Sequence, residues 1–253
     1  MASDRDLARR AVRAGAAAAT AVAGDAMAVT RKSVPTDLVS AADRASERAI
    51  LDLLRAERPL DAITGEEGAD VGSAGAGRRW LVDGLDGTVN FLRGLPQWCV
   101  AVVLLEGGAP AACAVLDPVH GQLFDAAAGK GAACDGAPML VREGAALEAA
   151  VISSFLRPDK LRGADAAAAF GPLIAGTGML RMGGAGTLEL AWLAAGRLDG
   201  WAQPNVDEWD WLPGRLLVEE AGGCTGIVEG ALTWHVAAAP ATFDALAALV
   251  EAR

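Results

Sequence analysis

One short segment restricts the fold and the chemistry of this chain more than any other. The apolar run 80–82 leads directly into Asp83, and Asp86 follows three residues later in a glycine-containing turn. Apolar runs bounded by such turns are typical of buried strands, so the segment predicts a strand with two carboxylates at its end. Carboxylates this close repel each other unless a cation holds them together. Because Asp-Gly pairs also form ordinary turns and helix caps, the segment alone leaves both interpretations open.

The ligand types near this segment favour a hard cation such as Mg²⁺. His120 and His235 are the only histidines, and the four cysteines contain no C-x-x-C pair, so neither a zinc knuckle nor a redox dithiol is indicated. Oxygen ligands without paired histidines select Mg²⁺, which binds one or two carboxylates together with water and phosphate. Gly87 and Thr88 come next and can direct backbone N–H groups at an anion. The segment therefore predicts a metal ion and a phosphate group side by side.

A second acidic cluster lies in the last quarter of the chain. Asp210 stands between Trp209 and Trp211, where a helix over 210–220 is expected to begin. An Asp at this position commonly caps the helix. It is also well placed to project into a cleft, so the residues alone leave its role open.

Several other functional classes lack their signatures. The sequence contains no G-x-G-x-x-G after a strand, no G-x-x-x-x-G-K-[ST] and no G-x-S-x-G, which argues against dinucleotide-binding, P-loop and nucleophile-elbow enzymes. The net charge of -10 argues against nucleic-acid or anionic-membrane partners, because phosphate groups repel such a field. Without a run of about 18 strongly apolar residues or a compact apolar leader, we expect neither a membrane span nor a signal peptide. The widely spaced cysteines favour free thiols and a cytoplasmic location.

The hydrophobic pattern predicts layers of helices and strands without strict alternation. We expect helices over 3–27 and 40–58, the second stopped by Pro59. This order favours an α+β fold with mixed sheets, in an N-terminal lobe over 1–145 and a C-terminal lobe over 146–253. The remaining expected elements are strands over 80–83, 99–105, 111–116, 150–155, 198–202 and after 223, and helices over 164–170, 187–195, 210–220 and from 241.

Three ordered motifs resemble those of the inositol monophosphatase superfamily. They are KSVPTDLVSAAD at 32–43 followed by GEE at 65–67, WLVDGLDGTVNF at 80–91, and WD at 209–210 with Gly214 and EAGG at 220–223. The resemblance spans most of the chain and implies the layered α/β/α/β/α sandwich of the inositol monophosphatase and fructose-1,6-bisphosphatase type. It also implies a Mg²⁺-dependent, lithium-sensitive phosphatase that forms a homodimer.

The resemblance also implies which residues bind two or three Mg²⁺ ions. Glu66, Asp83 and the backbone carbonyl of Leu85 would hold one ion. Asp83, Asp86 and Asp210 would hold the second, and Glu66 could help to hold a third.

The same resemblance assigns the remaining catalytic roles. Asp43 and Thr88 would orient the water that Glu66 and its metal activate for in-line attack on phosphorus. The backbone N–H groups of Gly87 and Thr88 would cradle the phosphate, with Asp86 and Asp210 beside it. No phosphoenzyme intermediate is needed.

Two positions depart from the family pattern. Gly84 replaces the usual Pro between the two aspartates and should loosen the turn. Gln203 stands where inositol-specific members place a Glu that contacts substrate hydroxyls, and it can still form a hydrogen bond but lacks the charge. The segment Gly184-Ala185-Gly186 falls at the substrate wall of the family, and its small residues leave room for a polyol or a larger group.

We therefore expect hydrolysis of a small phosphorylated metabolite, first inositol 1-phosphate or a related cyclitol or sugar phosphate. The alternatives within the enzymes are a histidinol-phosphate phosphatase and a 3'-phosphonucleotide phosphatase, and Asp207 and Glu208 near the expected entrance are compatible with an amine-bearing substrate. A non-catalytic metal- or phosphate-binding relative is a further alternative. It is disfavoured because every acidic motif residue is present.

Overall fold

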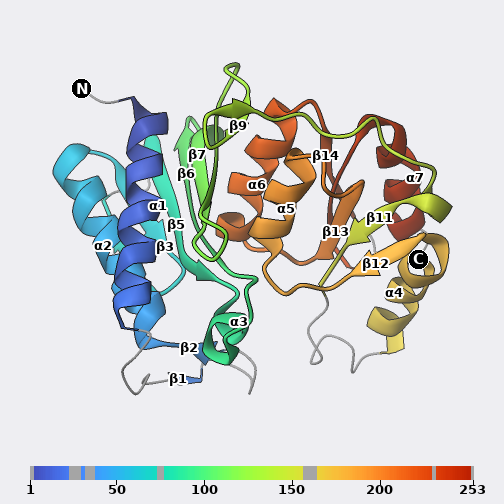
Figure 1. Cartoon of the computed structure of the whole chain (residues 1–253), viewed down its shortest axis with the longest axis horizontal. Helices are drawn as coiled ribbons and strands as arrows, with labels where there is room; N and C mark the ends of the chain where they lie inside the picture. The colour runs from blue at the N-terminus through green and yellow to red at the C-terminus, as the bar shows by residue number, and fades with distance from the viewer. Residues whose placement is uncertain are drawn as a thin grey trace.

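The computed structural model describes residues 3–22, 30–31, 38–72, 77–155, 164–229 and 232–251, and Figure 1 shows their arrangement. Helices α1 (Asp4–Ala21) and α2 (Ala41–Glu57) form one outer layer. Ser3 caps α1 by accepting the N–H of Asp6, and Ser40 forms a capping box with Asp43 at the start of α2. The two helices expected at the N-terminus are confirmed, α1 ending at Ala21; residues 23–27 of the first expectation lie outside the described residues.

The outer helices pack on a mixed eight-stranded sheet with the order β10-β9-β8-β7-β6-β5-β3-β4. All neighbouring strands are antiparallel except β3 and β5, which are parallel. The strands are β3 (Ala62–Gly65), β4 (Asp70–Val71), β5 (Arg78–Asp86), β6 (Cys99–Glu106), β7 (Ala109–Asp117), β8 (Gln122–Ala127), β9 (Ala132–Cys134) and β10 (Ala137–Pro138).

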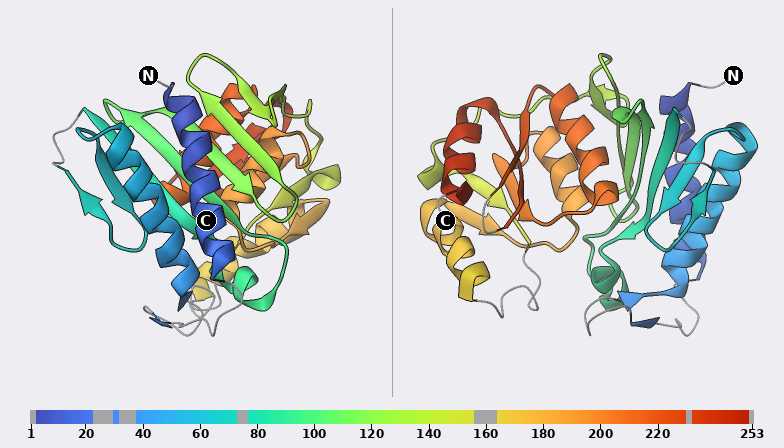
Figure 2. Two further views of the ribbon diagram at one scale, coloured as in Figure 1. Left: turned by 60° about the vertical axis from the view of Figure 1, so that its left-hand side comes forward. Right: turned by 180° about the vertical axis from the view of Figure 1, so that it is seen from behind.

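A second sheet of five strands has the order β12-β11-β13-β15-β14. Its strands are β11 (Val151–Ser153), β12 (Met179–Arg181), β13 (Gly200–Pro204), β14 (Cys224–Val228) and β15 (Trp234–Ala238). Helices α5 (Gly186–Ala194) and α6 (Glu208–Glu220) lie between the two sheets, and α4 (Ala164–Gly176) and α7 (Pro240–Glu251) cover the far side (Figures 1 and 2). The remaining elements are β1 (Thr30–Arg31), β2 (Leu38–Val39), α3 (Thr88–Arg93) and a 3-10 helix (Leu147–Ala149).

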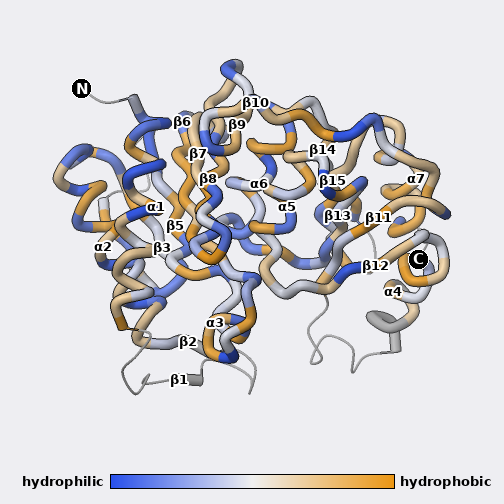
Figure 3. The backbone as a smooth tube through the Cα atoms, in the orientation of Figure 1, coloured by the Kyte–Doolittle hydropathy of each residue, from blue (hydrophilic) through white to orange (hydrophobic). Residues whose placement is uncertain are grey.

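The layers therefore follow the order helix, sheet, helix, sheet, helix, which confirms the expected α+β sandwich. Each interface has its own buried apolar cluster: one under α1 and α2, one around α5 and α6, and one between the second sheet and the outer helices. Figure 3 shows the apolar character of the long central strands β5 to β7. This burial is the main driving force for the layered arrangement.

The two sheets are drawn from separate parts of the sequence, since the first lies within residues 62–138 and the second within 151–238. Helix α6 nevertheless contacts strands of both sheets. The proposed division into lobes at 1–145 and 146–253 remains a prediction. Within the described residues, no helix combines the length and apolar character needed to cross a bilayer.

Candidate active site

The two aspartates of strand β5 reach the same face because the strand contains a bulge. In a regular strand, residues three apart point to opposite faces. Here Asp83 pairs with Ala101 and Asp86 with Cys99, so three steps on β5 match only two on β6. The extra residue of this β-bulge turns Asp86 to the face of Asp83.

The third carboxylate comes from the first turn of α6. Asp207 occupies the N-cap position without a side-chain cap bond, so Asp210 lies inside the helix and is not its cap. One carboxylate oxygen from each of Asp83, Asp86 and Asp210 lies within 4.8 Å of the others. Two chain segments far apart in sequence thus meet in one acidic cluster.

Thr187, at the start of α5, holds this cluster together and was not anticipated from the sequence. Its backbone N–H donates to Asp86 Oδ2 over 2.8 Å, and its hydroxyl donates to the backbone carbonyl of Asp210 over 2.9 Å. The β5 strand and the α6 helix are therefore tied to the same residue. No sequence pattern pointed to Thr187, because its role depends on a contact across 101 residues.

Burial and mutual repulsion disfavour ionisation of the three carboxyl groups when no cation is bound. Burial, then repulsion from neighbouring carboxylates, raises the pKa of Asp83 and of Asp210 well above the ordinary range. Burial raises the pKa of Asp86 to about 6. Asp83 Oδ2 is buried and has no hydrogen-bond partner among the described residues. An all-oxygen donor set with an unsatisfied buried oxygen fits a hard divalent cation such as Mg²⁺.

The remaining predicted ligands lie around this cluster. Glu66 directly follows β3, its backbone N–H donates to the carbonyl of Val82, and its charge acts on Asp83. The backbone N–H of Leu85 donates to Asp83 Oδ1 over 2.9 Å. The structure thus brings Glu66 and Leu85 next to Asp83.

The predicted water-orienting pair is in direct contact. The hydroxyl of Thr88 donates to Asp43 Oδ1 over 2.7 Å. The other oxygen of Asp43 accepts the backbone N–H and the hydroxyl of Ser40. Asp43 is also buried, and the cap of α2 fixes its orientation, so it is not a solvated surface acid.

The glycines of the β5 turn allow close packing on two sides. Gly87 has a φ of 94°, and a Cβ there would lie 2.8 Å from the carbonyl of Gln97. A Cβ on Gly84 would lie 2.9 Å from the backbone nitrogen of Glu47 and 3.0 Å from the carbonyl of Asp43. The absent side chain at Gly84 therefore lets α2 approach β5 closely, and the expected loosening of the turn stays a prediction.

This close approach gives a test of Gly84. We expect Gly84→Ala to lower the free energy of unfolding by about 1–3 kcal/mol, because the new methyl group meets backbone atoms that must shift. The shift displaces Asp43 from Thr88, so phosphatase activity should fall as well. Chemical denaturation and phosphate release measure the two effects. Gly77→Ala is the matched control, since a Cβ there meets nothing within 4 Å; equal effects of both substitutions would contradict the argument.

The predicted substrate-wall residues lie beside the turn at Gly87 that is predicted to bind phosphate. Gly184 and Ala185 precede α5, and Ala185 would lie 3.3 Å from a Cβ on Gly87. A Cβ on Gly186 would lie 3.1 Å from Gln203 Oε1, which is itself buried without a partner among the described residues. The small residues thus leave the Gln203 side chain next to the start of α5.

The two acids expected near the entrance lie at the start of α6. Asp207 precedes that helix, and Glu208 forms an ion pair of 2.8 Å with Arg79. The Glu208 carboxylate is therefore already matched by a cation.

Sequence reasoning also did not identify Glu189, a buried acid in α5. Only 3% of Glu189 is exposed, and its Oε1 accepts the backbone N–H of Gly183 over 2.8 Å. Burial raises the pKa of Glu189 to about 8, against the opposing effects of the Ser153 hydroxyl and the Gly183 N–H. The only signal in the sequence is a single acid within an otherwise apolar helix.

The raised pKa predicts a pH-dependent stability. Above about pH 4.5 the unfolded chain ionises Glu189 freely, whereas the folded chain resists ionisation until about pH 8. Its contribution to stability is therefore lost as the pH rises between these values. We expect the stability of Glu189→Gln to gain up to about 5 kcal/mol relative to that of the parent between pH 4.5 and 8.5. Denaturant titrations of both proteins without metal measure the difference, and a difference independent of pH would exclude a raised pKa.

The comparisons with known proteins agree on one family. The model described as "Inositol monophosphatase family" matches residues 3–252. The Nus factor SuhB of Pseudomonas aeruginosa is 37% identical over 204 residues, covering 79% of this chain and 75% of that protein. The inositol-1-monophosphatase of Rhizobium meliloti is 37% identical over 202 residues, covering 78% and 74%.

Solved structures show the same similarity. The extragenic suppressor protein suhB from Bartonella henselae is 30% identical with a TM-score of 0.87, covering 98% of this chain and 96% of that one. The inositol monophosphatase of Thermotoga maritima is 27% identical with a TM-score of 0.86, covering 98% and 97%. Both matches extend over nearly the whole chain.

Proposed function

Because the chain belongs to the inositol monophosphatase family and is a phosphoric monoester hydrolase, we propose that it hydrolyses a small phosphate monoester in a Mg²⁺-dependent reaction. The first candidate is inositol 1-phosphate or a related cyclitol or sugar phosphate. The observation that carries the proposal is the cluster of Asp83, Asp86 and Asp210, whose carboxylate oxygens converge within 4.8 Å. Carboxylates so placed need a cation, and a phosphate ester is the natural further ligand of Mg²⁺.

The proposed ligands of two or three Mg²⁺ ions are Glu66, Asp83, the carbonyl of Leu85, Asp86 and Asp210. Bound Mg²⁺ supplies the positive charge that polarises the phosphoryl oxygens and lowers the pKa of a water molecule. Thr187 supports this set, because its hydrogen bonds fix Asp86 relative to α6.

The protein groups would position the nucleophile and the phosphate. The Thr88 hydroxyl donates a hydrogen bond to Asp43 Oδ1, so its oxygen lone pairs are free to accept a hydrogen bond from the attacking water. Asp43 cannot turn away, because Ser40 holds its second oxygen. The backbone N–H groups of Gly87 and Thr88 are the proposed donors to the phosphate.

The alcohol of the substrate would lie against Gly186 and Gln203. Gln203 Oε1 has no partner among the described residues and can accept a hydrogen bond from a substrate hydroxyl. A neutral amide favours a neutral polyol over a cationic amine. Histidinol phosphate and 3'-phosphonucleotides are therefore the alternative substrates, in second place.

Catalysis must also be weighed against a binding role. Several relatives, including that of Pseudomonas aeruginosa, carry the name Nus factor SuhB. For this chain a non-catalytic role is disfavoured, because Asp43, Glu66, Asp83, Asp86 and Asp210 are all retained and the net charge is -10. Mg²⁺-dependent phosphate release distinguishes the two roles.

Three further properties belong to this proposal. We expect a homodimer, inhibition by lithium and a cytoplasmic location, as for the family that the motifs resemble. Light scattering of the purified protein tests the dimer, and adding LiCl to the phosphate assay tests the inhibition.

The decisive experiment is phosphate release with and without Mg²⁺ from four esters: inositol 1-phosphate, histidinol phosphate, fructose 1,6-bisphosphate and 3'-phosphoadenosine 5'-phosphate. We expect release that requires Mg²⁺, is abolished by EDTA and is fastest with inositol 1-phosphate. Fastest release from another ester would reassign the substrate. Release that does not respond to Mg²⁺ or EDTA would overturn the metal-dependent mechanism.

A further inference from the structure

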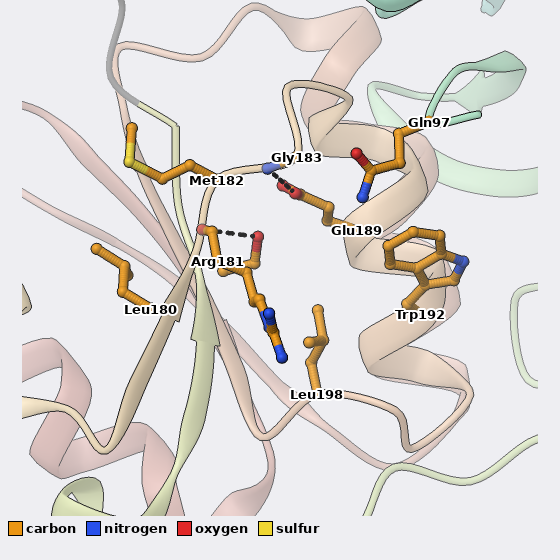
Figure 4. Close-up of a pocket in the computed structure, with 9 residues that line it drawn as sticks. Gln97, Leu180, Arg181, Met182, Gly183, Glu189, Trp192 and Leu198 are labelled. Carbon is orange, nitrogen blue, oxygen red and sulfur yellow. Dashed lines mark hydrogen bonds between the residues drawn. The ribbon is translucent and has the colours of Figure 1, made fainter. Parts of the chain in front are cut away.

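A separate cavity of about 400 Å³ lies beside the segment that carries the substrate wall. Its walls come from β11, β12 and α5 and from the segments around Gln97 and Leu198 (Figure 4). Gly183 lines the cavity, while the next residues, Gly184 to Gly186, form the proposed substrate wall. The volume is in the range of sites that bind small organic molecules.

One end of the cavity presents a hydrogen-bond acceptor that is not satisfied. Glu189 is 3% exposed and lines the cavity, and its Oε2 has no hydrogen-bond partner among the described residues. A buried carboxyl oxygen without a partner is costly, so a ligand that donates to it is strongly favoured. Burial raises the pKa of Glu189 to about 8, so without a ligand its carboxyl group is mostly protonated at neutral pH. A bound ammonium group would favour the ionised carboxylate and release this proton.

The other end of the cavity presents donors that suit an anion. Arg181 lines the cavity and forms no ion pair within the described part of the chain. In Figure 4 its guanidinium points away from the Glu189 carboxyl and toward Leu198. A guanidinium is a donor without acceptor capacity, and a carboxylate is the group that matches it.

From the positions of these two side chains we propose that the cavity binds a zwitterionic group of amino-acid size. Its ammonium group would lie against Glu189, and its carboxylate would lie against Arg181. A purely cationic ligand would leave Arg181 unmatched, and a purely anionic ligand would leave the buried Glu189 oxygen without a donor. Binding is non-covalent and requires no cofactor.

This chemistry could reach the cavity from two sources. A free amino acid would occupy it as a separate ligand, next to Gly183 and hence beside the substrate wall. Alternatively, the zwitterion would be the alcohol part of a phosphorylated substrate such as O-phospho-L-serine, and this second source rests on the proposed phosphatase function. The two are separated by measuring binding and hydrolysis independently.

The binding arm uses L-serine and its two half-molecules. Calorimetry and the fluorescence of the tryptophans, including Trp192 in the cavity, report binding with Mg²⁺ and inorganic phosphate present. We expect L-serine to bind at least about tenfold more tightly than ethanolamine, which lacks the carboxylate, or 3-hydroxypropionate, which lacks the ammonium. Glu189→Gln and Arg181→Gln should each weaken binding of L-serine by about tenfold or more, whereas Arg142→Gln, on an exposed arginine outside the cavity, should leave it unchanged.

The hydrolysis arm compares O-phospho-L-serine with phosphoethanolamine. A preference in kcat/KM for O-phospho-L-serine that Arg181→Gln removes would assign the zwitterion to the substrate. Binding of L-serine without that preference would assign it to a separate ligand. Because binding is measured without turnover, it is informative even if none of the esters is hydrolysed.

Two results would overturn the proposal. The first is the absence of binding by L-serine, L-glutamine and L-histidine up to about 20 mM. The second is binding that Glu189→Gln and Arg181→Gln do not weaken. Far-ultraviolet circular dichroism of both variants verifies that they are folded, and Glu189→Gln keeps the oxygen that accepts the Gly183 N–H.

Discussion

Replacing Asp86 by Asn should lower Mg²⁺-dependent phosphate release by about three orders of magnitude. The substitution keeps the size of the side chain and an oxygen for the Thr187 N–H, but it removes one of three carboxylates that converge within 4.8 Å. The amide is a weak ligand for Mg²⁺ and cannot neutralise its charge. Initial rates at saturating inositol 1-phosphate and Mg²⁺ measure the loss.

Stability measurements separate this loss from unfolding. Because burial disfavours the Asp86 carboxylate, which in turn raises the pKa of Asp83 and Asp210, metal-free Asp86→Asn protein should be as stable as the parent or more stable. Mg²⁺ should raise the melting temperature of the parent more than that of the variant. Asp52→Asn, on an exposed acid of α2, is the control and should change neither rate nor stability. Activity of Asp86→Asn within tenfold of the parent would remove this residue from the metal site.

Replacing Asp125 by Ala should lower the free energy of unfolding by about 3 kcal/mol. Asp125 is fully buried on β8. Its carboxylate accepts hydrogen bonds from the guanidinium groups of Arg5 and Arg9, and the bond from Arg9 is 2.8 Å long. Both arginines belong to α1, so these contacts fix the first helix on the sheet. Because the arginines are partly exposed and can hydrate after the change, the loss should stay below the full cost of a buried charge.

Urea denaturation measures this effect, and the control again comes from the chain itself. Asp52→Ala removes an exposed carboxylate and should change the free energy of unfolding by less than about 0.5 kcal/mol. Phosphate release per folded molecule should be unchanged by Asp125→Ala, because Asp125 lies on a strand that contributes no residue to the acidic cluster. A change below 0.5 kcal/mol for Asp125→Ala would show that the ion pairs of Asp125 with Arg5 and Arg9 contribute little to holding α1 on the sheet.

The helices were the part of the fold most accessible from the sequence. Ser3 and Ser40 mark the beginnings of α1 and α2, and Pro59 marks the end of the second, because caps and proline act through local backbone chemistry. Strand β15 was not predicted. All five residues of Trp234–Ala238 are buried and two are alanine, so the segment lacks the alternation of apolar and polar residues that indicates a strand. Its pairing with β13 and β14 is set by tertiary contacts.

The acidic residues of the site were named from the sequence, but the way they meet was not. Spacing alone places Asp83 and Asp86 on opposite faces of a strand, and only the bulge opposite Ala101 and Cys99 corrects this. Likewise, the roles of Thr187 and Glu189 can be recognised only from their contacts with Asp86 and Gly183 in the folded chain. Local spacing predicts which groups are available, whereas register and long-range contacts decide which groups touch.

The hydrogen bond between Thr187 and Asp86 also sets a constraint on the order of folding. It joins residues 101 positions apart, and Asp210 arrives from still later in the chain. Closing so long a loop is slow and requires that α5 and α6 have already docked on the first sheet. A cation that depends on all three acids has no complete site in any earlier species, so it cannot nucleate the fold. The Mg²⁺ ion held by all three aspartates should therefore act on the unfolding limb of the kinetics and lengthen the lifetime of the native state, without raising the folding rate.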